Sequence, residues 1–231
     1  MRQLIICVAA LISLSAGAHA DPCAEGKLLP TEIHEHTLYL KWVGRIDPNM
    51  DAKLEAAFKE AQGRIEEVSL SLNSCGGNIG DMRAAIRVLK WIKETHRLVT
   101  VVGRGATCAS ACVPAFLTGH RRLGALTSIW YFHEAGSRQI DAGDARFDPM
   151  MSARWTNRVF DDYFAPAGVS KKWIARVRRL ITDNDYWQTG RDLWESKSGI
   201  ITVPIENFEP RERERQLDPT PSVVCGVFCQ G

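Results

Sequence analysis

Hydrophobic and polar positions alternate along the chain in a way that predicts strands and helices following one another from residue 37 to residue 205. Runs rich in β-branched and aromatic residues are typical of strands at 37–43, 68–72, 98–102, 129–132 and 200–204. Apolar residues at helical spacing predict helices at 51–61, 82–92, about 110–117, 150–164 and 171–180. This alternation indicates an α/β fold of βαβ units, with a mainly parallel sheet and flanking helices.

The two ends of the chain differ from this central domain. A basic start at Met1-Arg2, an apolar run from Leu4 to Leu14 and the small-residue site Ala18-His-Ala20 are typical of a secretory signal peptide, residues 1–20. The apolar run is too short to span a bilayer. We therefore expect cleavage after Ala20 and a periplasmic or secreted protein. Residues 21–36 are interpreted as a polar lead-in, and 206–231 as a charged, proline-containing tail.

Charge and cysteine content narrow the function classes. A formal net charge of only +2 gives no argument for binding nucleic acid. Six of the 7 cysteines remain after cleavage, and an even number in an oxidising compartment predicts disulfides. Cys225 is expected to pair with Cys229, unless one of them ties the tail to Cys23; a zinc site is the other interpretation, but no histidine lies near that pair. No metal or cofactor is expected.

Two polar residues fall at predicted strand ends, where ligands bind in parallel sheets. Ser110 lies where a strand gives way to a helix, near the positive end of the helix dipole and unpaired N–H groups. It is either a plain helix cap or a nucleophile. His133 directly follows the strand 129–132 and is placed to act as the general base of such a serine. A buried carboxylate should then orient the imidazole, and Asp183 and Asp185 are the candidates.

A glycine-bearing loop, Asn73-Ser-Cys-Gly-Gly77, follows another predicted strand. Its two glycines let the backbone turn inward and aim an N–H group at the site. The N–H groups of Gly77 and Ala111 could then both donate to an oxyanion. A phosphate-binding loop is the competing interpretation, but the Lys-Ser/Thr of that motif is missing.

Four segments in the same order resemble the proteolytic subunit of Clp protease, in the ClpP/crotonase superfamily. They are Val68–Met82, with its Asn-Ser-Cys-Gly-Gly loop, the turn Gly105–Ala111, the segment Tyr131–Glu134, and Asp183–Thr189 with related residues up to Ile201. The similarity covers residues 37–203 and implies a ClpP/crotonase-like spiral of βαβ units. It also implies a nucleophile, a base, an orienting carboxylate and two oxyanion donors: Ser110, His133, Asp185 (with Asp183 as the fallback), Gly77 and Ala111.

The cysteines depart from the pattern of that family. Cys75 stands where the family usually has proline, and Cys108 and Cys112 bracket the nucleophile turn. The Cys-Ala-Ser-Ala-Cys turn resembles a group of exported Clp-like proteins. Because Cys108 and Cys112 would be one turn apart in a regular helix, a poor geometry for a disulfide, we expect Cys75 to pair with one of them.

The sequence therefore predicts an exported serine peptidase that hydrolyses peptides or unfolded segments through a Ser-His-Asp triad and an acyl-enzyme. A homo-oligomer is possible, and no ATPase unfoldase is expected, since ATP is absent outside the cytoplasm. A Ser-Lys peptidase is disfavoured because no lysine occurs from residue 94 to 170. The alternatives are a catalytically degenerate Clp-like binding or scaffold protein, and a crotonase-type acyl-transfer enzyme, which export would separate from coenzyme A.

Overall fold

The computed structural model describes residues 21–136, 149–182 and 185–205. Its strands are β1 (Lys27–Leu28), β2 (Glu32–His34), β3 (Thr37–Val43), β4 (Glu67–Asn73), β5 (Arg97–Val102), β6 (Thr107–Ala109), β7 (Arg121–Ala125), β8 (Ile129–Phe132), β9 (Tyr186–Thr189) and β10 (Val203–Ile205). Its helices are α1 (Met50–Ala61), a 3-10 turn (Gln62–Arg64), α2 (Ile79–Thr95), α3 (Cys112–Leu117), α4 (Pro149–Val159), a π-helical turn η2 (Phe160–Phe164), α5 (Lys171–Leu180) and α6 (Gly190–Glu195).

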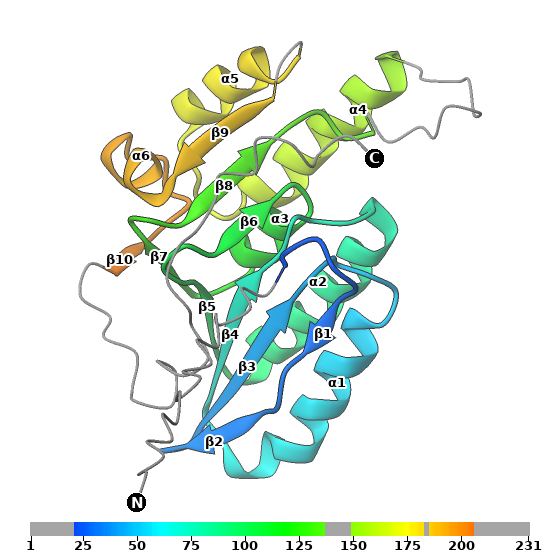
Figure 1. Ribbon diagram of the computed structural model, residues 1–231, viewed down its shortest axis with the longest axis vertical. Coiled ribbons are helices and arrows are strands. Elements are labelled where there is room, and N and C mark those ends of the chain that lie inside the picture. Colours follow the sequence, from blue (N-terminus) through cyan, green and yellow to red (C-terminus); the bar gives the residue numbers. More distant parts are fainter. Residues whose placement is uncertain (1–20, 137–148, 183–184, 206–231) are drawn as a thin grey trace, which may run out of the picture.

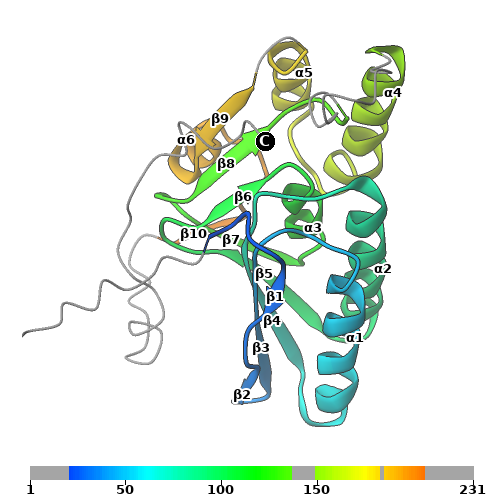
Figure 2. The same cartoon turned by 45° about the vertical axis from the view of Figure 1, so that its right-hand side comes forward.

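The strands form two sheets. The larger has the order β1-β3-β4-β5-β7-β10, with β2 paired to β3, and its strands β3, β4, β5, β7 and β10 run parallel. The smaller has the order β6-β8-β9, with β6 and β8 parallel and β9 antiparallel. Helices α1 and α2 lie side by side along one face of the larger sheet, and the smaller sheet lies beyond its β7 side (Figures 1 and 2). The predicted α/β class with a mainly parallel sheet is confirmed.

The core explains why the central strands form where the sequence predicts them. In β4, buried and partly buried residues alternate strictly, and Val68, Leu70 and Leu72 are fully buried. In α2 the buried residues recur at helical spacing and include Ile86, Leu89 and Ile92. Burying one such side chain contributes roughly 1.5–3 kcal/mol, so these faces specify the packing of helix on sheet.

Several short elements were not predicted. The lead-in 21–36 is part of the larger sheet, because β1 and β2 pair antiparallel with β3. Strands β6, β7 and β9 and helix α6 are new, and the last strand is Val203–Ile205 rather than 200–204. The expected helix 110–117 begins only at Cys112. The signal peptide, the tail with Cys225 and Cys229, and Asp183 lie outside the described residues.

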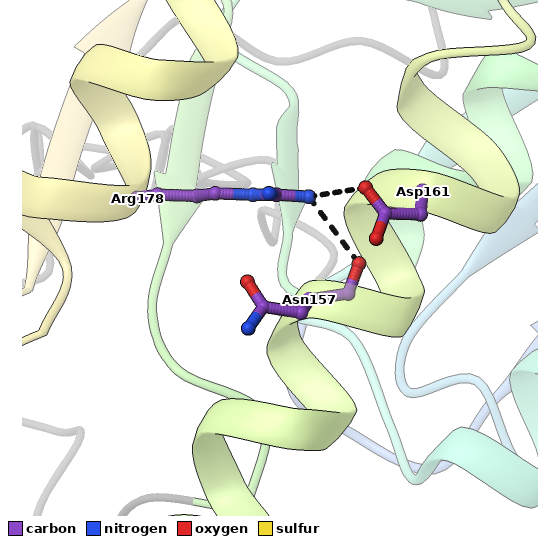
Figure 3. Close-up of polar contacts among 3 residues, drawn as sticks. All are labelled: Asn157, Asp161 and Arg178. Atoms are coloured by element: carbon purple, nitrogen blue, oxygen red, sulfur yellow. Dashed lines mark hydrogen bonds and ion pairs between the residues drawn. The ribbon is translucent and has the colours of Figure 1, made fainter.

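Arg178 and Trp173 of α5 connect this helix to α4, to the π-helical turn and to β8. Arg178 of α5 donates from its Nη2 atom to the Asp161 carboxylate at 2.5 Å and to the Asn157 carbonyl at 3.4 Å (Figure 3). The guanidinium therefore links α5 to both α4 and the π-helical turn. Trp173 of α5 packs edge-on against Phe132 of β8, with ring centroids 5.2 Å apart. These contacts fix the helices behind the strand that precedes His133.

Candidate active site

Ser110 and His133 lie within hydrogen-bond distance of each other. The distance from His133 Nε2 to Ser110 Oγ is 2.6 Å, and both side chains are partly buried. Ser110 directly follows β6 and His133 directly follows β8, and these two strands pair in parallel with Ala109 opposite Tyr131. The Ser110 N–H also donates to the Tyr131 carbonyl at 2.9 Å. The pair predicted from the sequence is thus brought together at the carboxyl ends of two adjacent parallel strands.

The backbone of Ser110 is in the left-handed region, with φ of 51°. Few residues other than glycine adopt this conformation, which costs about 1–2 kcal/mol and is enriched at functional sites. The sequence suggested that Ser110 begins a helix. Instead, Ser110 forms a tight turn two residues before α3 starts at Cys112. This turn directs the hydroxyl toward the histidine rather than back onto the helix.

Cys108 and Cys112 are joined by a disulfide across that turn, with their Cα atoms 5.2 Å apart. The expected pairing of Cys75 with one of them is therefore wrong. Cys108 lies on strand β6 and not in a helix, so the usual spacing of one helical turn does not apply. Both cysteines are fully buried, and the bond closes a loop around Ser110. The disulfide thus braces the nucleophile turn from within.

Cys75 instead pairs with Cys23, with Cα atoms 5.2 Å apart. The alternative in which Cys23 pairs with a cysteine of the C-terminal tail is therefore also wrong. The Cys75 N–H donates to the Pro22 carbonyl at 2.8 Å, so a backbone bond reinforces the disulfide. Together they attach the N-terminal segment to the glycine loop.

Hydrogen bonds connect the glycine loop to β6, the strand that directly precedes the nucleophile. The Thr107 N–H donates to the Asn73 side-chain carbonyl at 2.9 Å, and the Ser74 N–H donates to the Thr107 carbonyl at 2.7 Å. The Ala109 N–H donates back to the Ser74 carbonyl at 2.9 Å. These bonds join the end of β4 in the larger sheet to β6 in the smaller one. Sequence reasoning missed these roles of Asn73 and Ser74, although both lie in the motif it singled out.

Gly76 and Gly77 have no room for a side chain. A Cβ atom on Gly76, whose φ is 98°, would lie 2.8 Å from Ser110 Cβ and 3.1 Å from the Ala111 nitrogen. A Cβ atom on Gly77 would lie 2.0 Å from the Ile46 carbonyl oxygen. The glycine loop therefore contacts the nucleophile turn directly. Among the described residues, the N–H groups of Gly77 and Ala111 donate no backbone hydrogen bond, so both amides can take an acceptor.

Asp185 directly precedes β9, and His133 directly follows β8, the strand that β9 pairs with. The antiparallel register of β8 and β9 ends with Phe132 opposite Tyr186, and His133 and Asp185 are the residues next to that pair. Continuation of the register by one residue would bring their Cβ atoms to about 4.5–5.5 Å, within reach of a hydrogen bond between the side chains. Asp185 is, however, exposed. The expectation of a buried carboxylate is therefore wrong for this residue, and its role in orienting the histidine stays a prediction.

Two aromatic residues beside the pair were not singled out from the sequence. The Tyr131 ring stacks on the His133 imidazole, with centroids 5.1 Å apart, and on the Trp187 ring, with centroids 4.3 Å apart. Tyr131 and His133 share a face of β8 because side chains alternate along a strand. Among the described residues, no group of three or more His, Cys, Asp or Glu side chains is arranged to hold a metal ion.

Comparison with solved structures identifies the fold as ClpP-like. No protein-family model matches the chain, and no curated protein sequence matches it significantly. An Asn-to-Asp mutant of ClpP1 from Listeria monocytogenes is similar with a TM-score of 0.54 at 18% identity, covering 75% of this chain and 93% of that one.

Two structures of the membrane-bound stomatin-specific protease 1510-N are also similar. A serine-to-alanine mutant has a TM-score of 0.60 at 17% identity, covering 77% of this chain and 81% of its own. A lysine-to-alanine mutant in complex with a substrate peptide has a TM-score of 0.58 at 16% identity, with 74% of each chain covered. At this identity the likeness concerns the fold, which is one that serine proteases use. Within the described part of this chain, no helix has the length and apolar character needed to cross a membrane.

Proposed function

We propose that this protein is an exported serine peptidase in which Ser110 is the nucleophile and His133 its general base. The observation that carries the proposal is the 2.6 Å contact between Ser110 Oγ and His133 Nε2, on a turn whose φ of 51° is rare for serine. A base within about 2.6–3.2 Å of the hydroxyl is the geometry that activates a serine.

In the proposed reaction, His133 Nε2 takes the hydroxyl proton as Ser110 Oγ attacks a peptide carbonyl. The N–H groups of Gly77 and Ala111 stabilise the negative charge that develops on the carbonyl oxygen. The imidazolium then gives its proton to the leaving amine, the C–N bond breaks, and an acyl-enzyme remains. Water, deprotonated by His133, releases the acid product and restores the serine. Asp185 orients the imidazole.

Export is supported by the signal-peptide pattern of residues 1–20 and by the two disulfides, which form and persist in oxidising compartments. Peptides or unfolded segments are the proposed substrates. Self-association and the lack of an ATPase partner stay predictions.

The test is labelling by a fluorophosphonate probe of the mature protein, from Asp21 onward. Ser110→Ala should abolish labelling, and His133→Gln should reduce it by at least about 100-fold. The matched control is Ser196→Ala, which changes an exposed serine at the C-terminal end of α6 and should label like the wild type. Labelling that survives Ser110→Ala contradicts the assignment.

The exposure of Asp185 favours the alternative function, a catalytically degenerate Clp-like binding protein. A folded wild-type protein that neither reacts with the probe nor cleaves any member of a peptide library would establish this alternative. Peptide binding would then be measured directly, by fluorescence anisotropy with the same library.

A further inference from the structure

Three aromatic rings form a continuous stack that ends on the proposed catalytic histidine. Trp187 and Tyr131 are directly opposite each other in the β8–β9 pair, and their ring planes meet at 29°. The His133 imidazole also stacks on the Tyr131 ring, with the two planes at 18°. Both contacts are in the stacked range of aromatic pairs, with centroids 4.3 Å and 5.1 Å apart. The order along the face of the strands is therefore Trp187, Tyr131, His133.

Tyr131 contacts both members of the Ser-His pair. Its carbonyl accepts the Ser110 N–H at 2.9 Å, which holds the nucleophile turn, and its ring covers one face of the imidazole. The neighbouring residue Phe132 points to the opposite face of β8 and packs against Trp173 in the core. Packing of Phe132 in the core therefore fixes this part of β8, which restricts movement of Tyr131 away from the histidine.

Support of the imidazole by a neighbouring ring matters here because Asp185, the predicted orienting carboxylate, is exposed. An interaction with a carboxylate that water reaches is weakened by solvent and screened by salt, so it orients a ring less firmly than a buried carboxylate does. A stacked ring acts differently, since it blocks rotation of the imidazole about its Cβ–Cγ bond while leaving the in-plane nitrogens accessible. Backed by Trp187, the Tyr131 ring can hold the Nε2 atom toward Ser110 Oγ.

We propose that Tyr131, backed by Trp187, is a positioning residue for His133 and takes over part of the orienting role of a buried carboxylate. This inference rests on the proposed function, because it assigns the ring a role in that same Ser-His pair. It makes a specific chemical claim: the aromatic face of residue 131 is required, and its hydroxyl group is not.

The test compares Tyr131→Phe, which keeps the stack, with Tyr131→Leu, which removes it and keeps an apolar side chain. Misplacing a catalytic group by about 1 Å costs up to about 100-fold in rate. We expect Tyr131→Leu to lower kcat for a cleaved peptide, and the rate of probe labelling, by about 10- to 100-fold with KM unchanged. Tyr131→Phe should stay within about twofold of the wild type. Trp187→Leu should fall between them, and thermal melting of each variant controls for folding.

Three outcomes would overturn the proposal. They are wild-type kcat in folded Tyr131→Leu, a loss in Tyr131→Phe as large as that in Tyr131→Leu, and a rise in KM with unchanged kcat, which would indicate a substrate contact. Histidine-selective NMR provides a readout that does not need turnover. The His133 ring resonances should be a single sharp set in the wild type and Tyr131→Phe, and broadened or doubled in Tyr131→Leu. If the wild type proves inactive, the proposed function fails, and unchanged ring resonances in Tyr131→Leu would separately refute the positioning role.

Discussion

The disulfide Cys108–Cys112 should matter more for activity than for stability, and Cys23–Cys75 the reverse. The two bonds close loops of very different length, with sequence separations of 4 and 52 residues. A disulfide stabilises a protein mainly by restricting the unfolded chain, and the effect grows with the logarithm of loop length. The short bond, in contrast, encloses the turn that holds Ser110.

The magnitudes follow from the loop lengths and from the backbone of Ser110. The chain-entropy relation gives about 2 kcal/mol for the short loop and about 4 kcal/mol for the long one. Holding a serine at φ of 51° costs about 1–2 kcal/mol per residue, so a released turn gains about that much by relaxing. Since 1.36 kcal/mol corresponds to a tenfold change in rate, we expect the labelling rate to fall about tenfold when the Cys108–Cys112 disulfide is removed.

The assay uses two double variants of the mature protein, Cys108→Ala with Cys112→Ala, and Cys23→Ala with Cys75→Ala. Alanine is used because Cys108 and Cys112 are fully buried and a serine there would bury a hydroxyl group. Urea unfolding gives the free energy of unfolding, and the second-order rate with the fluorophosphonate probe reports the site. The long-loop variant should lose about 4 kcal/mol and keep its labelling rate within about twofold.

The long-loop variant keeps its site because backbone bonds still hold the glycine loop. The Ile46 N–H donates to the Gly76 carbonyl at 2.8 Å, and the Gly76 N–H donates to the Ser74 hydroxyl at 3.1 Å. A Cys108→Ala, Cys112→Ala variant that labels at the wild-type rate would refute the reasoning. A Cys23→Ala, Cys75→Ala variant that folds but loses more of its labelling rate than the Cys108→Ala, Cys112→Ala variant would also refute it.

Three further predictions test the glycine loop, the carboxylate and a helix cap. Gly76→Ala should lower the labelling rate more than tenfold, because its methyl group would meet the nucleophile turn at 2.8 Å; Gly63→Ala, with open space around it, is the matched control and should leave the rate unchanged. Asp185→Asn should lower kcat about tenfold or more, and an unchanged kcat in steady-state assays would remove Asp185 from the triad. Hydrogen bonds from the Thr189 backbone and side chain lower the pKa of Asp192, so its contribution to stability is present above pH about 4 and is lost as the pH falls through the lowered pKa. Urea unfolding of Asp192→Ala should therefore show a loss of stability at pH 7 that shrinks toward pH 2, and a pH-independent loss would contradict this.

The parts of the fold that the sequence predicted are those with long hydrophobic patterns. Strand β4 and helix α2 carry buried positions at periods of two and of about 3.6, and both patterns extend over several residues. The three residues of β6 and the four of β9 are too few to show a period. Their conformation is determined by pairing with β8, a contact between segments far apart in the chain.

The short strands, which form by pairing between segments far apart in the chain, also explain what was missed at the site. Ser110 and His133 were found because each follows a strand end and because four motifs occur in order. Missing β6 led to the helical placement of Cys108 and hence to the wrong disulfide. Missing β9 hid the register that stacks Trp187 on Tyr131, which no local pattern encodes.

The two departures from the resembled family serve one physical purpose. Cys75 stands where that family usually has proline, a residue that stiffens a loop by fixing φ. Here the Cys23–Cys75 disulfide and the Pro22 carbonyl restrict the same position from outside the loop. At the nucleophile turn, Cys108–Cys112 likewise holds a conformation that serine disfavours. In both places a covalent bond replaces stiffness intrinsic to the chain, and such a bond is stable only where thiols are oxidised, which agrees with the export proposed from residues 1–20.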